Sequence, residues 1–238
     1  MALSRAWGTV VVRRIRLFGE DILRQRAKPV KAIDASVRRL IDDLVETMED
    51  AEGLGLAATQ IGVAKRVFVA RDGDQILAFV NPTIVARHGR EVGLEGCLSL
   101  PGLQGNVPRA KEITIRALDR AGRTISHTFT GLAARCCQHE YDHLNGVMYV
   151  DHTKDLFWLE AAAERVDLPE DDETSDHWVD EGGQSIQIVR VPTDIREITD
   201  YYAELIADLD LDAAGEHLLA EDDGTAPATD EVTEDISG

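Results

Sequence analysis

The sequence has few cysteines and no long apolar run, and both absences limit the classes of protein to which it can belong. Three of its 238 residues are cysteine, and two of these, Cys136 and Cys137, are adjacent. This is not the disulfide framework of a small secreted domain, and it suits a reducing compartment. The apolar stretch Val10 to Val12 is too short for a secretory signal. No segment approaches the roughly 20 apolar residues of a membrane helix, so we expect a cytoplasmic protein without a membrane anchor.

Basic residues are scarce in the last third of the chain, where the excess negative charge lies. The formal net charge of the whole sequence is −19. Residues 1–154 contain 22 Lys and Arg against 18 Asp and Glu, a balance of +4. Residues 155–238 contain 3 against 26, a balance of −23. The first part of the chain is therefore close to neutral, and no direct nucleic-acid site is evident.

A helix and two hairpins are predicted in the first half of the chain. Residues 34–50 have the apolar spacing of an amphipathic helix, with Asp34 or Ser36 available as its N-cap. Four short runs rich in β-branched and other apolar residues follow, in two pairs separated by turn residues. These runs are 66–70 with 75–80, and 111–118 with 123–130.

Helical spacing returns over residues 132–144, where the sequence predicts a central helix. Thr130 is the expected N-cap, and Gly146 is the expected C-terminal stop. The order of helix, strands and then central helix is typical of an α+β domain.

The motif with the clearest chemistry is His139-Glu140-x-x-His143, which lies in this predicted helix. Histidines at i and i+4 point the same way, so both imidazoles can bind one metal ion. A glutamate directly after the first histidine lies beside that ion and can take a proton from water. A solvated helix with two surface histidines is the competing interpretation. It is weakened because Leu132 and Cys136 continue the histidine stripe, which indicates a buried face.

A catalytic site of this kind needs a third protein ligand, and the spacing leaves two kinds of candidate. A metzincin would have a histidine six residues after His143, but that residue is Tyr149. Glu160 and Glu164 have the spacing of a thermolysin-like peptidase. Cys97 would supply a soft thiolate ligand, although a lone cysteine is more often a small buried apolar residue.

Three separated elements resemble the peptide deformylase family, in the family's order and with similar separations. They are Gly53–Gln60 (GLGLAATQ), Glu95–Ser99 (EGCLS) and Gln138–Gly146 (QHEYDHLNG). The likeness extends over about residues 12–152. Thr59 departs from the proline found in many members, at a position that concerns loop stiffness more than chemistry.

The resemblance implies a fold, an ion and a reaction. The fold is α+β, with antiparallel sheets around a central helix that carries the H-E-x-x-H motif. Cys97, His139 and His143 would bind one divalent ion, with Fe²⁺ as the native metal and Zn²⁺, Ni²⁺ or Co²⁺ as alternatives. The reaction is removal of the N-formyl group from the N-terminal formylmethionine of newly synthesised polypeptides, with release of formate.

The same resemblance assigns the catalytic groups. Glu140 is the general acid and base, which takes a proton from the attacking water and delivers it to the departing amine. The Gln60 side-chain amide and the Leu98 backbone N–H donate to the formyl oxygen, where negative charge develops. All these positions match the family, which argues against an inactive deformylase-like binding module.

Substrate contacts are expected at Leu54, Gly55, Leu132 and Cys136. A glycine lets the backbone come close to an extended peptide, which the family binds by strand addition. The other three side chains would line an apolar methionine pocket, with core packing as the competing interpretation for Leu132 and Cys136.

Four further residues are assigned supporting parts. Glu95 is expected to orient a ligand histidine, and Asp142 to pair with Arg109. Arg135 is unusually polar for a helix beside an apolar pocket, and we expect it at the pocket rim or with its charged end in solvent.

The composition changes after about residue 167 and becomes strongly acidic. Together with the resemblance, this change implies a peptide-deformylase-like catalytic domain, residues 1–166, and an acidic extension, residues 167–238. Residues 156–166 are expected as the closing helix of the domain. The extension is expected to be partly disordered, with a possible strand at 184–191 and an amphipathic helix at 193–211. The partners that the resemblance implies are nascent formylmethionyl polypeptides, close to the ribosome.

Overall fold

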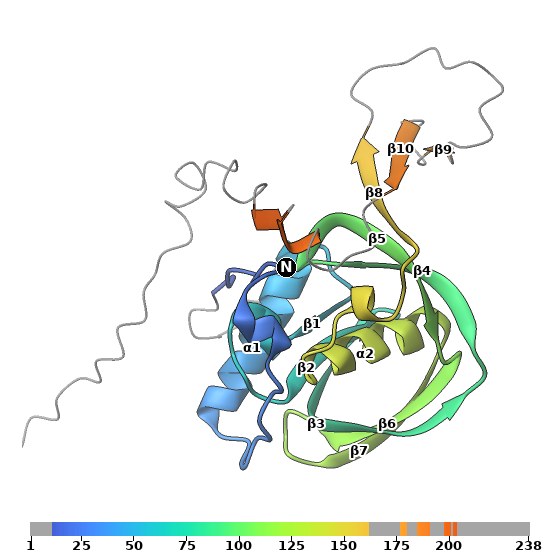
Figure 1. Ribbon diagram of the computed structural model, residues 1–238. Coiled ribbons are helices and arrows are strands. Elements are labelled where there is room, and N and C mark those ends of the chain that lie inside the picture. Colours follow the sequence, from blue (N-terminus) through green and yellow to red (C-terminus); the bar gives the residue numbers. More distant parts are fainter. Residues whose placement is uncertain (1–10, 162–176, 180–184, 191–197, 201, 204–238) are drawn as a thin grey trace, which may run out of the picture.

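The computed structural model of this chain describes residues 11–161, 177–179, 185–190, 198–200 and 202–203. In this part of the chain, strands pair antiparallel into two sheets, and α2 lies beside them (Figure 1). The first sheet has the order β1 (Gly55–Ala57), β2 (Val67–Asp72), β3 (Gln75–His88), β6 (Glu112–Leu118), β7 (Thr124–Thr130). The second has the order β4 (Glu91–Cys97), β5 (Leu100–Arg109), β8 (Leu156–Ala161), β10 (Ser185–Arg190), β9 (His177–Val179). The helices are η1 (Asp21–Arg24), α1 (Ala35–Asp50), η2 (Ala58–Ile61), α2 (Gly131–His143) and η3 (Tyr149–Asp151).

Helix α1 forms where the apolar spacing predicts it. Its N-cap is Asp34, whose carboxylate accepts the Val37 N–H at 3.0 Å. Ser36 is not the cap, and its hydroxyl donates to Asp34 instead. The apolar stripe of α1 packs against β1 and β2, which is how an amphipathic helix covers a sheet face.

Both predicted hairpins are present, as β2–β3 and β6–β7. Strand β3 continues to His88, beyond the predicted end, because its second half pairs with β6. The register shifts beside Asn81, which has a φ of +52°. Its side-chain amide holds this conformation by exchanging two 2.8 Å hydrogen bonds with the backbone of Val30.

Helix α2 follows β7 directly and contacts β1, β2 and β7. Thr130 occupies the N-cap position, as predicted, although its side chain makes no capping hydrogen bond. Gly146 does follow the helix with a φ of +74°, and a Cβ there would collide with the Arg24 carbonyl. The chain therefore turns at Gly146 because glycine alone fits the turn.

The second sheet contains the features that the sequence pattern did not predict. Strands β4 and β5 were not expected. The helix expected over 156–166 is wrong for its described part, because residues 156–161 form β8 between β5 and β10. Pairing on both sides stabilises a strand in a segment whose composition favours a helix. Residues 162–166 lie outside the described part of the chain.

The described pieces of the acidic extension are strands β9 and β10 and the helical residues 198–200 and 202–203. Strand β10 covers most of the strand predicted at 184–191, and it pairs with β8 and with β9. Residues 198–200 and 202–203 are helical, within the predicted helix, and Ile198 and Tyr202 are buried. The other residues of the extension, and its predicted disorder, lie outside the described residues.

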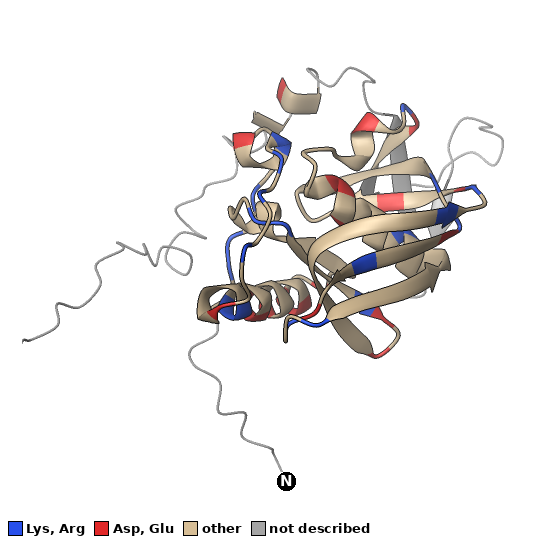
Figure 2. Ribbon diagram, turned by 90° about the horizontal axis from the view of Figure 1, so that it is seen from below, with Lys and Arg blue, Asp and Glu red and all other residues tan. Residues whose placement is uncertain are grey.

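Charges of both signs are interspersed over the described elements (Figure 2). Residues 11–161 contain 21 Lys and Arg against 20 Asp and Glu. The region that holds the first sheet, strands β4, β5 and β8 of the second sheet, and both long helices is thus almost neutral. Within the described residues, no helix combines the length and apolarity needed to cross a membrane.

Candidate metal centre and active-site pocket

Helix α2 and strand β4 supply the three side chains of a candidate metal centre. His139 and His143 lie one turn apart in the buried second half of α2. Cys97 is the last residue of β4 and pairs with Leu100 across the short turn to β5. This turn aims the cysteine at the helix, although the two segments are about 40 residues apart in sequence.

The donor atoms of these residues converge. Cys97 Sγ lies 3.3 Å from His143 Nε2, which lies 3.2 Å from His139 Nε2. All three ligand atoms are within 4.8 Å of one another. Metal bonds of about 2.0–2.3 Å in tetrahedral geometry would place such atoms about 3.3–3.6 Å apart. A thiol and two imidazoles at this spacing fit a divalent ion of the Fe²⁺ or Zn²⁺ kind.

Glu95 orients His139, as the sequence predicted. The Glu95 carboxylate accepts a hydrogen bond from His139 Nδ1 at 3.0 Å, which leaves Nε2 free for a ligand bond. Arg109 donates to both Glu95 oxygens, at 2.8 and 2.9 Å, and also pairs with Asp142, as predicted. Burial raises the pKa of Glu95, but hydrogen bonds from Arg109 and His139 outweigh it and lower the pKa to about 2.

Replacing Glu95 by glutamine is expected to weaken metal binding by about 10–100-fold, because the histidine loses its charged acceptor. It should also cost about 3–5 kcal/mol of folding free energy, because two buried arginines lose their partner. The folded pKa of Glu95 is about 2, below its ordinary 4.5. Its stabilisation is therefore complete above pH 4.5 and is lost as the pH falls towards 2.

Denaturant unfolding of wild type and Glu95→Gln at pH 7 and pH 3 measures this difference, and competition with a chelator measures metal affinity. The stability gap should shrink at the lower pH. A gap that stays constant between the two pH values would contradict an ionised, hydrogen-bonded Glu95.

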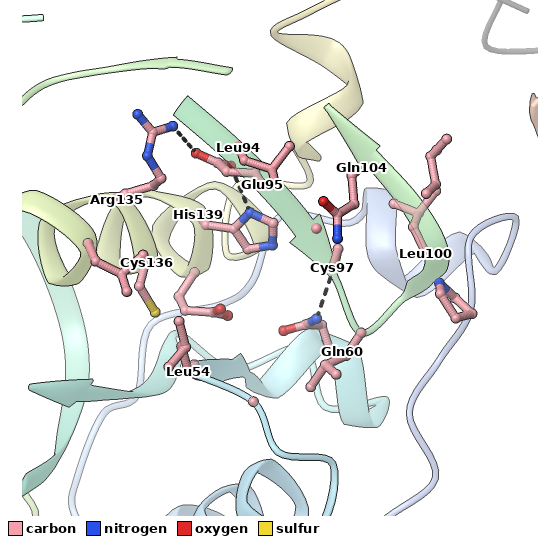
Figure 3. A pocket seen from close by; sticks show the side chains of 18 of the residues that line it. Leu54, Gln60, Leu94, Glu95, Cys97, Leu100, Gln104, Arg135, Cys136 and His139 are labelled. Atoms are coloured by element: carbon pink, nitrogen blue, oxygen red, sulfur yellow. Dashed lines mark hydrogen bonds and ion pairs between the residues drawn. The ribbon is translucent and has the colours of Figure 1, made fainter. Parts of the chain in front are cut away.

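Arg135 lines the pocket, but the expectation that its charged end reaches solvent is wrong. The side chain is buried and donates to Glu95 Oε1 at 2.9 Å and to the Val107 carbonyl at 2.8 Å. Figure 3 shows Arg135, Glu95 and His139 as one chain of contacts. The sequence signal that could have revealed it is a basic residue on the buried face of a helix, since such a charge requires an acidic partner.

Glu140 is buried beside the metal centre and is electrostatically unusual. Its Oε2 has no hydrogen-bond partner within the described structure. Burial raises the pKa of Glu140 to about 7, against the opposing effect of His139. Burial and the neighbouring His139 both lower the pKa of His143, which keeps that ring in the neutral form that binds metals. A carboxylate with a pKa near neutrality can both accept and return a proton.

Gln60 is buried in η2 rather than exposed in a loop. Its Oε1 accepts the Ala57 N–H at 2.8 Å, and its Nε2 donates to Ser99 Oγ at 3.2 Å. These two contacts fix the amide with its NH₂ group towards Cys97, whose Sγ is 3.6 Å away.

A pocket of about 420 Å³ opens over this centre (Figure 3). Leu54 and Gly55 line one side and Leu98 another, while Leu132 and Cys136 come from α2. Leu132 is 63 % exposed, so core packing does not explain it, whereas Cys136 is buried. The volume and the mainly apolar walls suit one side chain of a small ligand or peptide.

Gly55 is the point where the chain passes closest to Glu140. A Cβ at Gly55 would lie 2.7 Å from Glu140 Cγ and Oε1, and 2.8 Å from Cys136 Sγ.

We expect Gly55→Ala to displace the carboxylate and to lower kcat/KM by about 10²-fold, as a 1 Å misplacement of a catalytic group can. Steady-state kinetics measure this, with Gly73→Ala in an exposed turn as control. Wild-type kinetics for Gly55→Ala would contradict the close approach.

A partly buried thiol, two buried imidazoles and an adjacent glutamate are the side chains that a metal-dependent hydrolase uses. The sequence comparisons give the family. The family model described as polypeptide deformylase matches residues 12–157. The chain therefore belongs to the polypeptide deformylase family, metal-dependent hydrolases that remove N-formyl groups from nascent polypeptides.

Individual relatives agree with this family. A peptide deformylase of Alkalilimnicola ehrlichii is 49 % identical over 146 residues, which are 60 % of this chain and 82 % of the relative. The crystal structure of a peptide deformylase from Legionella pneumophila is 45 % identical, with a TM-score of 0.59, over 60 % of this chain and 86 % of that one. A Met-Ala-Ser-bound peptide deformylase from Acinetobacter baumannii is 34 % identical, with a TM-score of 0.58, over 61 % and 100 %. These structures confirm the predicted α+β class with antiparallel sheets.

Proposed function

We propose that Cys97, His139 and His143 hold the metal ion of this deformylase and that Glu140 moves the proton of the reaction. The observation that carries the proposal is the convergence of one sulfur and two ring nitrogens within 4.8 Å. The central position of α2 against the first sheet supports it, because this position brings the H-E-x-x-H motif to the pocket. An ion bound there would acidify the attacking water and polarise the formyl oxygen.

The side chains and backbone groups around the ion have separate roles in proton transfer and in stabilising the formyl oxygen. Glu140 takes a proton from the attacking water and returns it to the departing amine, for which its raised pKa is suited. The Gln60 amide and the Leu98 backbone N–H donate to the formyl oxygen as negative charge develops there. Each such donor contributes about 3–4 kcal/mol to lowering the barrier. The contacts that fix Gln60 hold its NH₂ group ready for this role.

The methionine side chain of the substrate occupies the apolar pocket. Leu54, Leu132 and Cys136 line it, and Gly55 lets the peptide backbone approach. The Met-Ala-Ser tripeptide bound to the relative from Acinetobacter baumannii has the sequence type expected of a deformylated product. The substrates of this chain are formylmethionyl polypeptides, which it encounters in the cytoplasm close to the ribosome.

Two further parts of the proposal concern the metal and the domains. A thiolate with two imidazoles suits Fe²⁺ as the native ion, with Zn²⁺, Ni²⁺ and Co²⁺ as substitutes. Residues 1–166 form the deformylase domain and residues 167–238 an acidic extension. The pairing of β10 with β8 supports an extension that begins by adding strands to the second sheet of the domain.

Release of formate from a formyl-methionyl tripeptide tests the function. The protein, loaded anaerobically with Fe²⁺, should turn over this peptide, and the acetyl-methionyl peptide of the same sequence serves as the control. No release of formate by the metal-loaded protein would contradict the proposed function.

A further inference from the structure

Residues 97–104, called here the β4–β5 turn, run from the last residue of β4 into the first part of β5 and include Cys97 and Leu98. Hydrogen bonds from other segments hold this turn at several points. The Phe18 N–H donates to the Ser99 carbonyl at 2.9 Å. The Tyr149 hydroxyl donates to the Leu103 carbonyl at 2.8 Å. Because residues 97, 98 and 100–104 line the pocket, these hydrogen bonds hold its wall in place.

A third anchor comes from the C-terminal extension. The Tyr202 hydroxyl donates to the carbonyl of Pro101 at 2.9 Å, and Pro101 lines the pocket. Tyr202 lies about 45 residues beyond the end of the family match at residue 157. The extension therefore reaches the wall of the active-site pocket through a residue that lies outside the matched deformylase region.

Packing supports the hydrogen bond. Tyr202 is 1 % exposed, and its ring centroid lies 6.0 Å from that of Phe18 and 5.4 Å from that of Trp158. Trp158 in turn covers Gly102, where a Cβ would lie 3.3 Å from the indole ring. Tyr202 thus joins the N-terminal segment, strand β8 and the β4–β5 turn in one aromatic group.

The same apolar cluster reaches the metal centre. It contains Ile198, Tyr202, Leu100 and Tyr149, and the partly buried Cys97 packs against it. Tyr149 also stacks on the ring of His139, with centroids 5.9 Å apart. A cavity at Tyr202 would therefore loosen packing that continues to the Cys97 side chain.

We infer that Tyr202 is a positioning residue, through which the C-terminal extension holds the β4–β5 turn and so the Cys97 thiol and the Leu98 N–H in place. This inference rests on the proposed function of these two groups. If Tyr202 has this role, the C-terminal extension contributes to the structure of the active site.

The test uses the full chain loaded with Co²⁺, whose absorption spectrum reports the thiolate ligand, and compares wild type with Tyr202→Ala. We expect Tyr202→Ala to shift the cobalt spectrum and to release metal to a chelator about 10-fold faster, as loss of a supporting contact does. Its kcat should fall by about 10-fold or more. Tyr202→Phe keeps the ring and loses the hydrogen bond to Pro101, so we expect about 3-fold faster release.

Ile41→Ala is the matched control, because Ile41 is buried in the apolar stripe of α1 and lines no part of this pocket. It should lower Tm while leaving the cobalt spectrum, the release rate and kcat unchanged. Wild-type values of all three in Tyr202→Ala, or equal changes in Ile41→Ala, would overturn the inference. If Tyr202→Ala does not fold, a wild-type release rate in Tyr202→Phe overturns it.

The outcomes also separate the two proposals. A wild-type protein that releases no formate would overturn the proposed function. The cobalt spectrum and the release rate would still decide the role of Tyr202, because neither measurement requires turnover.

Discussion

Replacing Glu140 by alanine is expected to lower kcat by about 10²–10⁴-fold while metal binding is retained. General acid–base catalysis contributes a factor of this size, and Glu140 is not among the three converging donor atoms. Formate release from a formyl-methionyl peptide measures kcat, and metal analysis of the purified variant measures binding.

The isosteric variant Glu140→Gln serves as the control for shape. It fills the same space but cannot accept the proton, so we expect a loss similar to that of alanine. If either metal-loaded variant kept more than about a tenth of the wild-type kcat, the proton-transfer role would be excluded, since a tenfold effect is below the range of such catalysis.

Replacing Cys97 by alanine is expected to weaken metal binding by more than about 10²-fold and to remove activity with it. A lost ligand should cost more than a lost supporting hydrogen bond, for which 10–100-fold is typical. Cys137→Ala is the matched control, because Cys137 is a fully buried thiol in the cluster beneath α2, outside the group of converging donors. It should keep both metal and activity.

The same experiment separates the deformylase site from the thermolysin-like alternative. In that alternative Glu160 or Glu164 is the third ligand. The backbone of Glu160 lies in β8, and Glu164 lies outside the described residues. Retention of metal in Cys97→Ala, together with its loss in Glu160→Ala or Glu164→Ala, would reject the role given to Cys97.

Local patterns in the sequence were sufficient for the elements whose apolar faces point inward. Helix α1 and both hairpins follow the ordinary rule that apolar side chains recur with the period of the helix or of the strand on the side facing the core. The H-E-x-x-H motif could be placed on a helix for the same reason, since α2 buries His139, Glu140 and His143 on one side.

Strand β4 could not be predicted in this way because its alternation is inverted. Glu95 is buried, while Val92 is 65 % and Leu94 is 48 % exposed. The buried side of the strand is filled by an ion-pair network with Arg109 and Arg135, and Leu94 faces the pocket. Binary patterning assumes that apolar residues point inward, so it fails at a strand that forms the wall of a site.

Contacts between distant segments were the second source of error. Strand β8 depends on its two neighbours, which are far away in sequence. Arg135 and Glu95 are 40 positions apart, so no local pattern links them. The family resemblance proposed residues for the chemistry, but it could not propose supporting residues that lie outside the shared motifs, such as Tyr202.

Three side chains share the carboxylate of Glu95, and this sharing restricts which substitutions the site can accept during evolution. Glu95 serves Arg109, Arg135 and His139 together. Exchange of Glu95 alone removes the buried carboxylate that compensates Arg109 and Arg135, whereas joint replacement of the ion pairs by apolar side chains can be nearly neutral for folding. Substitutions here are therefore non-additive, and we expect these positions to vary as a group.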